Sequence, residues 1–263
     1  MPVHRSSQDG VVVLTLDRPE RRNALDGAMW EELRDAAKAS EGARVVIITG
    51  AGGHFCAGMD LAVDNPLIAR VGPALMSGDE GVAHALIRDL KACVQAIADL
   101  SCPTYAAIEG TCVGGGLEIA LACDVRIAAE NAVLSLPEAR IGMIPDLGGC
   151  ARLTRLVGPG RAADLIATGR RLSGAEAFTL GVVERVALPG RTLDAARNAA
   201  QDILGNAPEA VRLALTVVRV SSDLGLTEAL SVETRAGVLA LVSGEAVEGL
   251  TAFQGKRSPR WPA

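Results

Sequence analysis

Aromatic residues are scarce in this chain. Its 263 residues include three Phe, two Trp and one Tyr, about 2% of the whole, although 49% are hydrophobic. A core for a chain of this length must therefore be built mainly from Ala, Val, Leu and Ile. The chain also lacks any stretch of 18 uncharged apolar residues, so we expect no membrane span.

Basic residues and histidines are also few. The formal net charge is −5 and the sequence pI is about 5.3. Nucleic-acid binding needs a basic face, so we expect no nucleic-acid partner. The three histidines, His4, His54 and His84, do not have the spacing of metal ligands, so we expect no metal site.

The cysteines lack C-x-x-C spacing, and the N-terminal residues MPVHRSSQDG lack the apolar segment of a secretory signal. Both features are typical of a cytoplasmic protein with reduced, mostly buried thiols. The six cysteines are Cys56, Cys93, Cys102, Cys112, Cys123 and Cys150.

Strand and helix patterns alternate over the first three-quarters of the chain, and helical patterns dominate the rest. This order predicts an α/β fold with a helical C-terminal segment. We expect one structural unit, with a core over 1–195 and the helical segment over 196–263. The expected strands are 11–17, 44–50, 103–110, 124–130, 132–136 and a short one at ERVA; the expected helices start near Asp26 and cover 81–100, 191–206, 207–221 and 226–254; 62–80 is expected to be a loop.

Three consecutive glycines, Gly114 to Gly116, follow the third of these strands and open a helical run. Glycine lets a ligand approach the backbone closely, and the first N–H groups of a helix have no internal partner. These N–H groups also lie at the positive end of the helix dipole, so the segment suits an oxyanion or a phosphate. Glu118 follows about one helical turn later, within reach of a substrate bound there.

A second strand-to-helix junction, at 51–61, has the same design of a strand followed by small residues. If both junctions face one cleft, the N–H groups of Met59 and Gly115 can converge on one carbonyl oxygen. Two such donors stabilise a developing oxyanion, and loss of one costs roughly 3–4 kcal/mol. The sequence therefore indicates an oxyanion hole between the two junctions.

Four segments in order resemble the crotonase superfamily of enoyl-CoA hydratases and isomerases. They are LDRPERRNAL at 16–25, VVIITGAGGHFCAGMDL at 45–61, GTCVGGGLEIALACDVRIAAENAVLSLPEARIGMIPDLGGCARLTRLVG at 110–158 and RRLSGAEAFTLGVVERV at 170–186. The resemblance implies a spiral of ββα units with a helical C-terminal segment. It also implies an acyl-CoA thioester substrate, with CoA as part of that substrate and no separate cofactor, and a homotrimer or homohexamer.

The resemblance also assigns residues to the substrate. The backbone N–H groups of Met59 and Gly115 would be the oxyanion donors, and the aromatic ring and base near the C-terminus could reach the CoA of a neighbouring subunit. The implied CoA and substrate contacts are Arg22, Ala24, Leu25, Ala57, Gly58, Asp60, Leu61, Gly114, Phe253 and Lys256.

The two acids of the hydratases in this family correspond to Glu118 and Glu138. Hydration needs a water activated at Cβ and a proton delivered to Cα, which one ionised and one protonated carboxyl group can provide. By the same resemblance Glu138 lies nearer the Cα proton and Glu118 holds the water. Asp146 stands where many hydratases have glycine, and the three acids together resemble those of 3,5-2,4-dienoyl-CoA isomerases. We therefore expect an enoyl-CoA hydratase, with an isomerase as the alternative.

Other classes fit less well. The sequence VGGGLE lacks the G-x-G-x-x-G spacing of a dinucleotide site. A hydrolase with Cys56 or Ser135 as nucleophile would lack the G-x-S-x-G elbow and an evident histidine partner. A non-catalytic acyl-CoA-binding protein, or one that also binds RNA, does not account for the retained glutamate pair or for the acidic pI.

Overall fold

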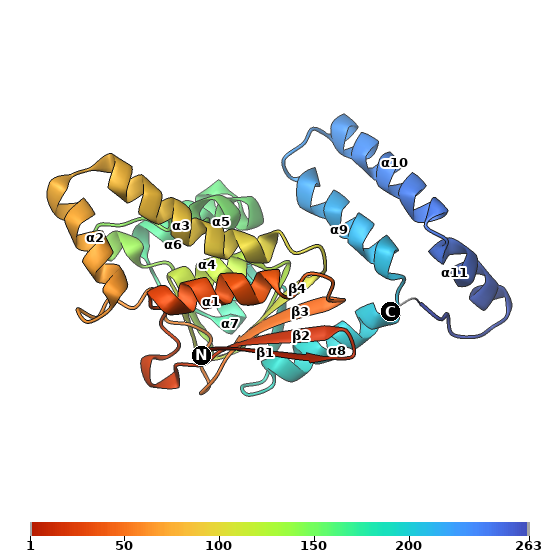
Figure 1. Ribbon diagram of the computed structural model, residues 1–263, viewed down its shortest axis with the longest axis horizontal. Helices are drawn as coiled ribbons and strands as arrows, with labels where there is room; N and C mark the ends of the chain where they lie inside the picture. The colour runs from red at the N-terminus through yellow and green to blue at the C-terminus, as the bar shows by residue number, and fades with distance from the viewer. Residues whose placement is uncertain (1, 262–263) are drawn as a thin grey trace.

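The computed structural model describes residues 2–261, apart from the side chains of residues 70 and 73–75. It has the mixed α/β architecture that the sequence predicts (Figure 1). The strands are β1 (Val3–Gln8), β2 (Val11–Leu16), β3 (Val45–Gly50), β4 (Thr104–Ile108), β5 (Thr111–Val113), β6 (Val125–Ala129), β7 (Val133–Ser135), β8 (Leu172–Ser173) and β9 (Arg185–Ala187). The α-helices are α1 (Gly27–Lys38), α2 (Pro66–Ser77), α3 (Glu80–Ala98), α4 (Gly115–Ala122), α5 (Gly149–Val157), α6 (Pro159–Thr168), α7 (Gly174–Leu180), α8 (Thr192–Leu204), α9 (Pro208–Ser221), α10 (Leu226–Val242) and α11 (Glu245–Gln254). Two 3₁₀ helices, η1 (Pro19–Arg21) and η2 (Glu138–Ile141), complete the order.

The strands form two sheets. The larger has the order β1-β2-β3-β4-β6-β9, in which β1 is antiparallel to β2 and the remaining neighbours are parallel. The smaller has the order β5-β7-β8, with β5 parallel to β7. Parallel strands end at the same edge of a sheet, so the loops after β3 and β4 lie side by side.

Helices cover both faces of the larger sheet, and β3 shows why. Val46 and Ile48 belong to the core cluster shared with α1, α3 and α4, whereas Val45 and Ile47 pack in a second cluster with α8. Side chains of a strand alternate between its two faces, so a strand buried on both faces is apolar throughout. The second cluster contains Ala196, Ala199 and Ala200 of α8, so the expected boundary at 195/196 falls inside a helix that belongs to the core.

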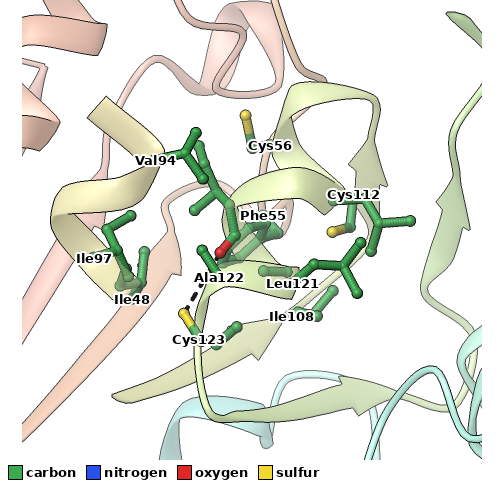
Figure 2. Packing of buried hydrophobic residues seen from close by; sticks show 14 of the residues in the cluster. Ile48, Phe55, Cys56, Val94, Ile97, Ile108, Cys112, Leu121, Ala122 and Cys123 are labelled. Carbon is green, nitrogen blue, oxygen red and sulfur yellow. Dashed lines mark hydrogen bonds between the residues drawn. The ribbon is translucent and has the colours of Figure 1, made fainter. Parts of the chain in front are cut away.

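Every residue of α4 is buried. Figure 2 shows its C-terminal residues packed between strand side chains such as Ile48 and Ile108 and the α3 residues Val94 and Ile97. As the composition predicts, aliphatic side chains and buried thiols make up most of the core around α4, with Phe55 among them. Cys56, Cys93, Cys102, Cys112 and Cys123 are free and buried.

The predicted loop over 62–80 is wrong, because α2 lies within it. Proline and glycine were read there as helix breakers. Pro66 instead occupies the first turn, where its missing N–H costs nothing. The side chain of Asn65 accepts a hydrogen bond from the N–H of Leu67 at 3.0 Å and so starts the helix, and Leu67 is buried in the core.

The helix predicted over 226–254 is broken in two. Gly244 lies between α10 and α11 with a φ of +87°, a left-handed conformation that favours glycine. The side chain of the next residue, Glu245, accepts hydrogen bonds from the N–H groups of Glu209 and Ala210 at 3.0 and 3.1 Å. The break therefore allows one carboxylate to cap the start of α9.

Helices α9 to α11 form an arm that projects from the rest of the chain (Figure 1). Arg219 of α9 attaches it by two hydrogen bonds to Asp124, both at 2.7 Å. Helix α10 has no buried residue. No single described helix is long and apolar enough to cross a membrane; α10 and α11 reach that length and composition only as a pair, bent by 68°.

Candidate active site

The two predicted junctions lie against each other. We call 51–61, after β3, the first junction and 110–118, after β4, the second junction. The N–H of Cys56 donates to the oxygen of Thr111 at 2.9 Å, and the N–H of Val113 donates to the oxygen of Cys56 at 3.0 Å. These bonds form a parallel bridge between Cys56 and Cys112, which holds the loop of one junction beside the strand of the other.

Glycines permit the close approach. A Cβ on Gly116 would lie 2.4 Å from the backbone oxygen of Cys56, and one on Gly58 would lie 2.8 Å from the oxygen of Val113 and 3.1 Å from the nitrogen of Gly115. Gly114 has φ +57° and ψ −130°, a conformation open essentially to glycine alone. Gly114 and Gly116 are therefore required by the backbone and its packing as well as by any ligand.

The two expected oxyanion donors lie on these facing segments. Gly115 is the first residue of α4, where an N–H has no partner inside the helix. Met59 pairs with Leu25 in a bridge formed by the N–H groups of Leu25 and Asp60, at 2.8 and 2.9 Å, which leaves its own N–H out of the pairing. Neither N–H forms a hydrogen bond to another group within residues 2–261.

The N-terminal segment expected to contact CoA is joined to the first junction. The N–H of Ala57 donates to the oxygen of Arg22 at 3.0 Å, and that of Leu25 donates to the oxygen of Gly58 at 2.8 Å. Arg22 is exposed and Leu61 is 52% exposed, so both can meet a ligand, whereas Ala24 is buried.

Asp60 differs from the expectation of a direct substrate contact. Its side chain is buried, accepts a hydrogen bond from the N–H of Ala62 at 3.0 Å and pairs with Arg18 at 3.0 Å. Burial raises the pKa of Asp60, but the N–H of Ala62 and the Arg18 guanidinium outweigh it, and the pKa lies below its usual range. Its carboxylate therefore supports the loop from inside.

Two residues of the N-terminal segment carry much of this support and were missed in the sequence. Asn23 is fully buried with φ +58°, and its amide donates to the backbone oxygens of Ala51, His54 and Phe55 at 3.0, 2.7 and 3.2 Å. Arg18 donates to the oxygen of Ala24 at 2.7 Å as well as to Asp60. An asparagine before an apolar run gives only a weak local signal, since the carbonyls it binds lie about 30 residues away.

The structure brings the three predicted acids together. Glu118 is buried, and its Oε1 accepts hydrogen bonds from the N–H groups of Leu147 and Gly149, both at 2.8 Å. Glu138 begins η2, and its Oε1 lies 3.0 Å from where a Cβ on Gly114 would stand. Its Oε2 is buried without a hydrogen-bond partner. A buried oxygen without a partner among the described residues is suited to bind a water or a polar ligand atom.

The acids shift one another's protonation. Burial raises the pKa of Glu118 to about 7; the charges of Glu138 and Asp146 add to the rise, and the N–H groups of Gly149 and Leu147 oppose it. Burial and the charge of Asp146 raise the pKa of Glu138. Burial also raises the pKa of Asp146, against the charge of Lys91. The raised pKa of Glu118 lets this group exchange protons near neutral pH.

The chain's other candidate nucleophiles are placed differently. Cys56 is fully buried, and burial raises the pKa of its thiol to about 12. Its Sγ donates to the oxygen of Asn23 and accepts from the N–H of Gly58, so it is a structural thiol. Ser135 is buried in β7. Neither has the exposed, activated geometry of a nucleophile.

Phe253 and Lys256 are not brought to the acids of their own chain. Phe253 is in the last turn of α11 and Lys256 lies two residues beyond that helix, which belongs to the arm and lies away from α4 and α5 (Figure 1). Phe253 is 83% exposed. Their expected contact with a neighbouring subunit's CoA remains a prediction.

A cavity of about 300 Å³ lies away from Glu118, Glu138 and Asp146. It is lined where β3 and β4 begin, by Arg44 and Pro103, and at the arm by Glu209 and Glu245. The expected oxyanion donors, Met59 and Gly115, lie on the segments that follow the other ends of those strands. Within residues 2–261 no three His, Cys, Asp or Glu side chains are grouped so that they could hold a metal ion.

Known proteins resemble this chain over its whole length. A model of the enoyl-CoA hydratase/isomerase family matches residues 6–263. A probable mitochondrial enoyl-CoA hydratase 2 of Arabidopsis thaliana is 37% identical, over 96% of this chain and 82% of its own. A carnitinyl-CoA dehydratase of Proteus mirabilis is 37% identical over 98% and 97%. The crystal structure of an enoyl-CoA hydratase from Bacillus anthracis superposes with a TM-score of 0.89 at 36% identity, covering 99% of each chain.

Proposed function

This chain belongs to the enoyl-CoA hydratase/isomerase family, and from that premise we propose that it adds water across the 2,3 double bond of a 2-enoyl-CoA thioester. The observation that carries the proposal is the pair of acids beside the glycine triplet, with Glu118 buried and Glu138 half-buried. Glu138 has Oε1 next to Gly114 and Oε2 buried with no hydrogen-bond partner among the described residues, and Glu118 lies on the helix that Gly115 opens.

The proposed reaction assigns one task to each group. The N–H groups of Met59 and Gly115 bind the thioester oxygen and stabilise the enolate that forms. Both hydrogen bonds to Glu118 end on Oε1, which leaves Oε2 to hold the water. The water oxygen bonds to Cβ while one of its protons passes to the ionised carboxylate of Glu118, and the proton that Glu138 delivers bonds to Cα. Transfer of the proton from Glu118 to Glu138 then restores both groups. The sum is one water added without oxidation or reduction, so no cofactor besides the substrate's CoA is required.

Glu138→Gln tests the proposal. The amide keeps the size of the side chain but cannot donate a carboxyl proton, so we expect crotonyl-CoA hydration to fall about 10²- to 10⁴-fold. CoA affinity, measured by calorimetry, should stay within about twofold, because the CoA contacts lie in other segments. A wild-type protein that hydrates no short- or medium-chain 2-enoyl-CoA would overturn the proposal.

Asp146 supports a second candidate, a 3,5-2,4-dienoyl-CoA isomerase. Its half-buried carboxyl group is close enough to raise the pKa of both glutamates. Three acids around one acyl chain can move a proton along a diene. Asp146→Asn should leave hydration within about threefold if Asp146 is structural. Loss of dienoyl-CoA isomerisation in that variant, with wild-type isomerisation faster than hydration, would favour the isomerase.

The same substrate panel addresses the non-enzymatic alternative. Purified protein should be assayed on 2-enoyl-, 3-enoyl- and 3,5-dienoyl-CoA thioesters, with acyl-CoA binding measured in parallel. Binding without turnover of any of them would indicate an acyl-CoA-binding protein. One relative is named a dehydratase, and dehydration is the reverse of the proposed hydration. The panel should therefore also include 3-hydroxyacyl-CoA thioesters.

We also propose that the arm mediates self-association into a homotrimer or homohexamer. Exposed aliphatic and aromatic side chains lie along α10 and α11, and monomeric proteins seldom expose so many together. They are Leu226, Leu230, Val238, Leu239, Leu241, Val242, Val247, Leu250 and Phe253. Light scattering coupled to size exclusion should give three or six times the mass of one chain; a monomer would refute the assembly.

A further inference from the structure

The position of Glu118 depends on a turn from another part of the chain. Glu118 stands on α4, but the N–H groups that bind its Oε1 belong to Leu147 and Gly149, about 30 residues further on. No other hydrogen bond to this carboxylate forms within the described chain. Whatever holds residues 147–149 therefore also holds the acid.

Arg152 holds that turn. Its Nη1 donates to the backbone oxygen of Leu147 at 3.1 Å. Gly148 has φ +119°, and a Cβ built on it would lie only 1.9 Å from the same nitrogen. The guanidinium thus occupies the space that a side chain at Gly148 would need. The turn and the arginine are packed as one unit, with the oxygen of Leu147 bound to Arg152 and its N–H bound to Glu118.

The other side of Arg152 is tied to α3. Its Nη2 donates to Oε1 of Gln95 at 2.9 Å, and Gln95 donates to Asp99 at 2.7 Å. The guanidinium therefore joins α3 to the turn, and the turn joins it to α4. Burial lowers the pKa of Arg152, while the charges of Glu118 and Asp99 oppose that change.

We propose that Arg152 is a positioning residue that keeps the carboxylate of Glu118 in place by clamping the turn at 147–149. It does so through backbone groups, and none of its hydrogen bonds within the described residues reaches the N-terminal segment or the first junction. The kinetic part of this inference rests on the proposed hydration. Its geometric part does not, because it concerns only how an acid is held.

The charges around Glu118 decide what loss of the clamp should do. Glu138 and Asp146 face it from η2 and the following loop, Cys150 lies beside all three acids, and Lys91 of α3 acts on Asp146. The two turn N–H groups counteract burial and these negative charges. If the turn loosens, these hydrogen bonds weaken and the neutral carboxyl group is favoured.

The experiment compares Arg152→Gln and Arg152→Lys with Arg155→Gln, a matched change on the same helix. Arg155 is exposed and pairs with Asp223, away from the turn. In Arg152→Gln we expect kcat for crotonyl-CoA to fall about 10- to 100-fold, because misplacement of a catalytic group by about 1 Å has an effect of this size. KM should change by less than about twofold, and Arg152→Lys should recover part of kcat.

A second readout does not need turnover. Carbon-13 detection of glutamate carboxyl groups, assigned with Glu118→Gln, should show the titration midpoint of Glu118 shifted to higher pH in Arg152→Gln and unchanged in Arg155→Gln. Arg152→Gln also removes a positive charge near Glu118, so Gln95→Leu, which keeps the arginine, is titrated beside it. Should the wild-type protein hydrate nothing, the proposed function fails, yet the titration of these two variants still decides the role of Arg152.

Equal kcat, KM and Glu118 midpoints in Arg152→Gln and Arg155→Gln would overturn the inference. So would parallel losses of kcat and CoA affinity with an unmoved midpoint, since these indicate general damage. If Arg152→Gln does not fold, Gln95→Leu decides, because it removes the exposed partner of Arg152 and leaves the arginine present. A raised Glu118 midpoint in that variant supports the clamp, and an unmoved one refutes it.

Discussion

The two junctions of the active site each leave a backbone N–H without a partner, but they do so by different means. In the second junction, Gly115 is the first residue of α4, and the start of any helix leaves such groups free. In the first junction no helix follows directly, because α2 begins only at Pro66. There the N–H of Met59 is free because its neighbours pair with Leu25 on either side of it.

The means of support differ accordingly. The second junction depends on missing side chains, since a Cβ at Gly116 would collide with the backbone of Cys56. The first depends on side chains that arrive from elsewhere, chiefly the amide of Asn23 and the guanidinium of Arg18. We therefore expect added methyl groups to damage the second junction most and truncated side chains to damage the first.

The largest effect is expected from Gly116→Ala. Its methyl group would lie 2.4 Å from the oxygen of Cys56, so the two junctions must separate. Loss of one oxyanion donor costs about 3–4 kcal/mol, and we expect kcat/KM to fall about 10²- to 10³-fold. Gly160→Ala in α6 is the control, because a Cβ there would meet nothing within 4 Å. Equal losses in the two variants would show that backbone collision is not the cause.

Next in size is Asn23→Ala, which tests the first junction. It removes three donated hydrogen bonds to buried carbonyls and places alanine at φ +58°. We expect the free energy of unfolding, measured by urea denaturation, to fall by about 3–4 kcal/mol. Asn23→Gly separates the two causes, since glycine accepts the backbone conformation but lacks the amide. A loss below about 1 kcal/mol in both variants would mean that the amide does not support the loop.

Glu118 should make the second junction sensitive to rising pH. Its pKa is raised from 4.5 to about 7, so the fold favours the protonated carboxyl group. This contribution is fully present below about pH 4.5 and is lost as the pH rises through 7, a change of about 3 kcal/mol. Glu118→Gln keeps a neutral acceptor and should remove the dependence. Stability measured by denaturation from pH 4.5 to 8 checks this; parallel curves for wild type and variant would refute it.

Asp60 should make the first junction sensitive to falling pH, with a smaller effect. Its pKa lies below the usual value because the N–H of Ala62 and the charge of Arg18 outweigh burial. Its contribution is present above the unfolded pKa, near 4, and is lost as the pH falls through the lower folded value. Wild type should therefore lose stability relative to Asp60→Asn on acidification. If the contributions of Asp60 and Glu118 to stability changed in the same direction with pH, the expected contrast between the two junctions would be wrong.

Local patterns predicted much of the fold. The apolar runs of β2, β3 and β4 and the start of α1 at Asp26 are confirmed, the latter by a hydrogen bond from the N–H of Met29 at 2.9 Å. Helix α2 and the break at Gly244 were not foreseen. In both places proline or glycine is compatible with more than one structure, and distant packing selects among them.

The three acids also combine a part that the sequence predicted with a part that depends on distant contacts. Glu118, Glu138 and Asp146 were chosen by resemblance to a family, and their spacing along the chain does not indicate that they meet. Their meeting depends on the turn at 147–149, which Arg152 holds against α3. No local signal marks that arginine, because each of its partners except Leu147 is remote in the sequence.

The sequence by itself determined where strands and helices alternate and where glycine permits two segments to touch, because these depend on side-chain period and on the steric cost of a Cβ. Tertiary structure alone decided which carboxyl groups have a raised pKa and which are ion-paired. That depends on burial and on charges that reach a site from several elements, as for Glu118 beside Glu138 and for Asp60 beside Arg18.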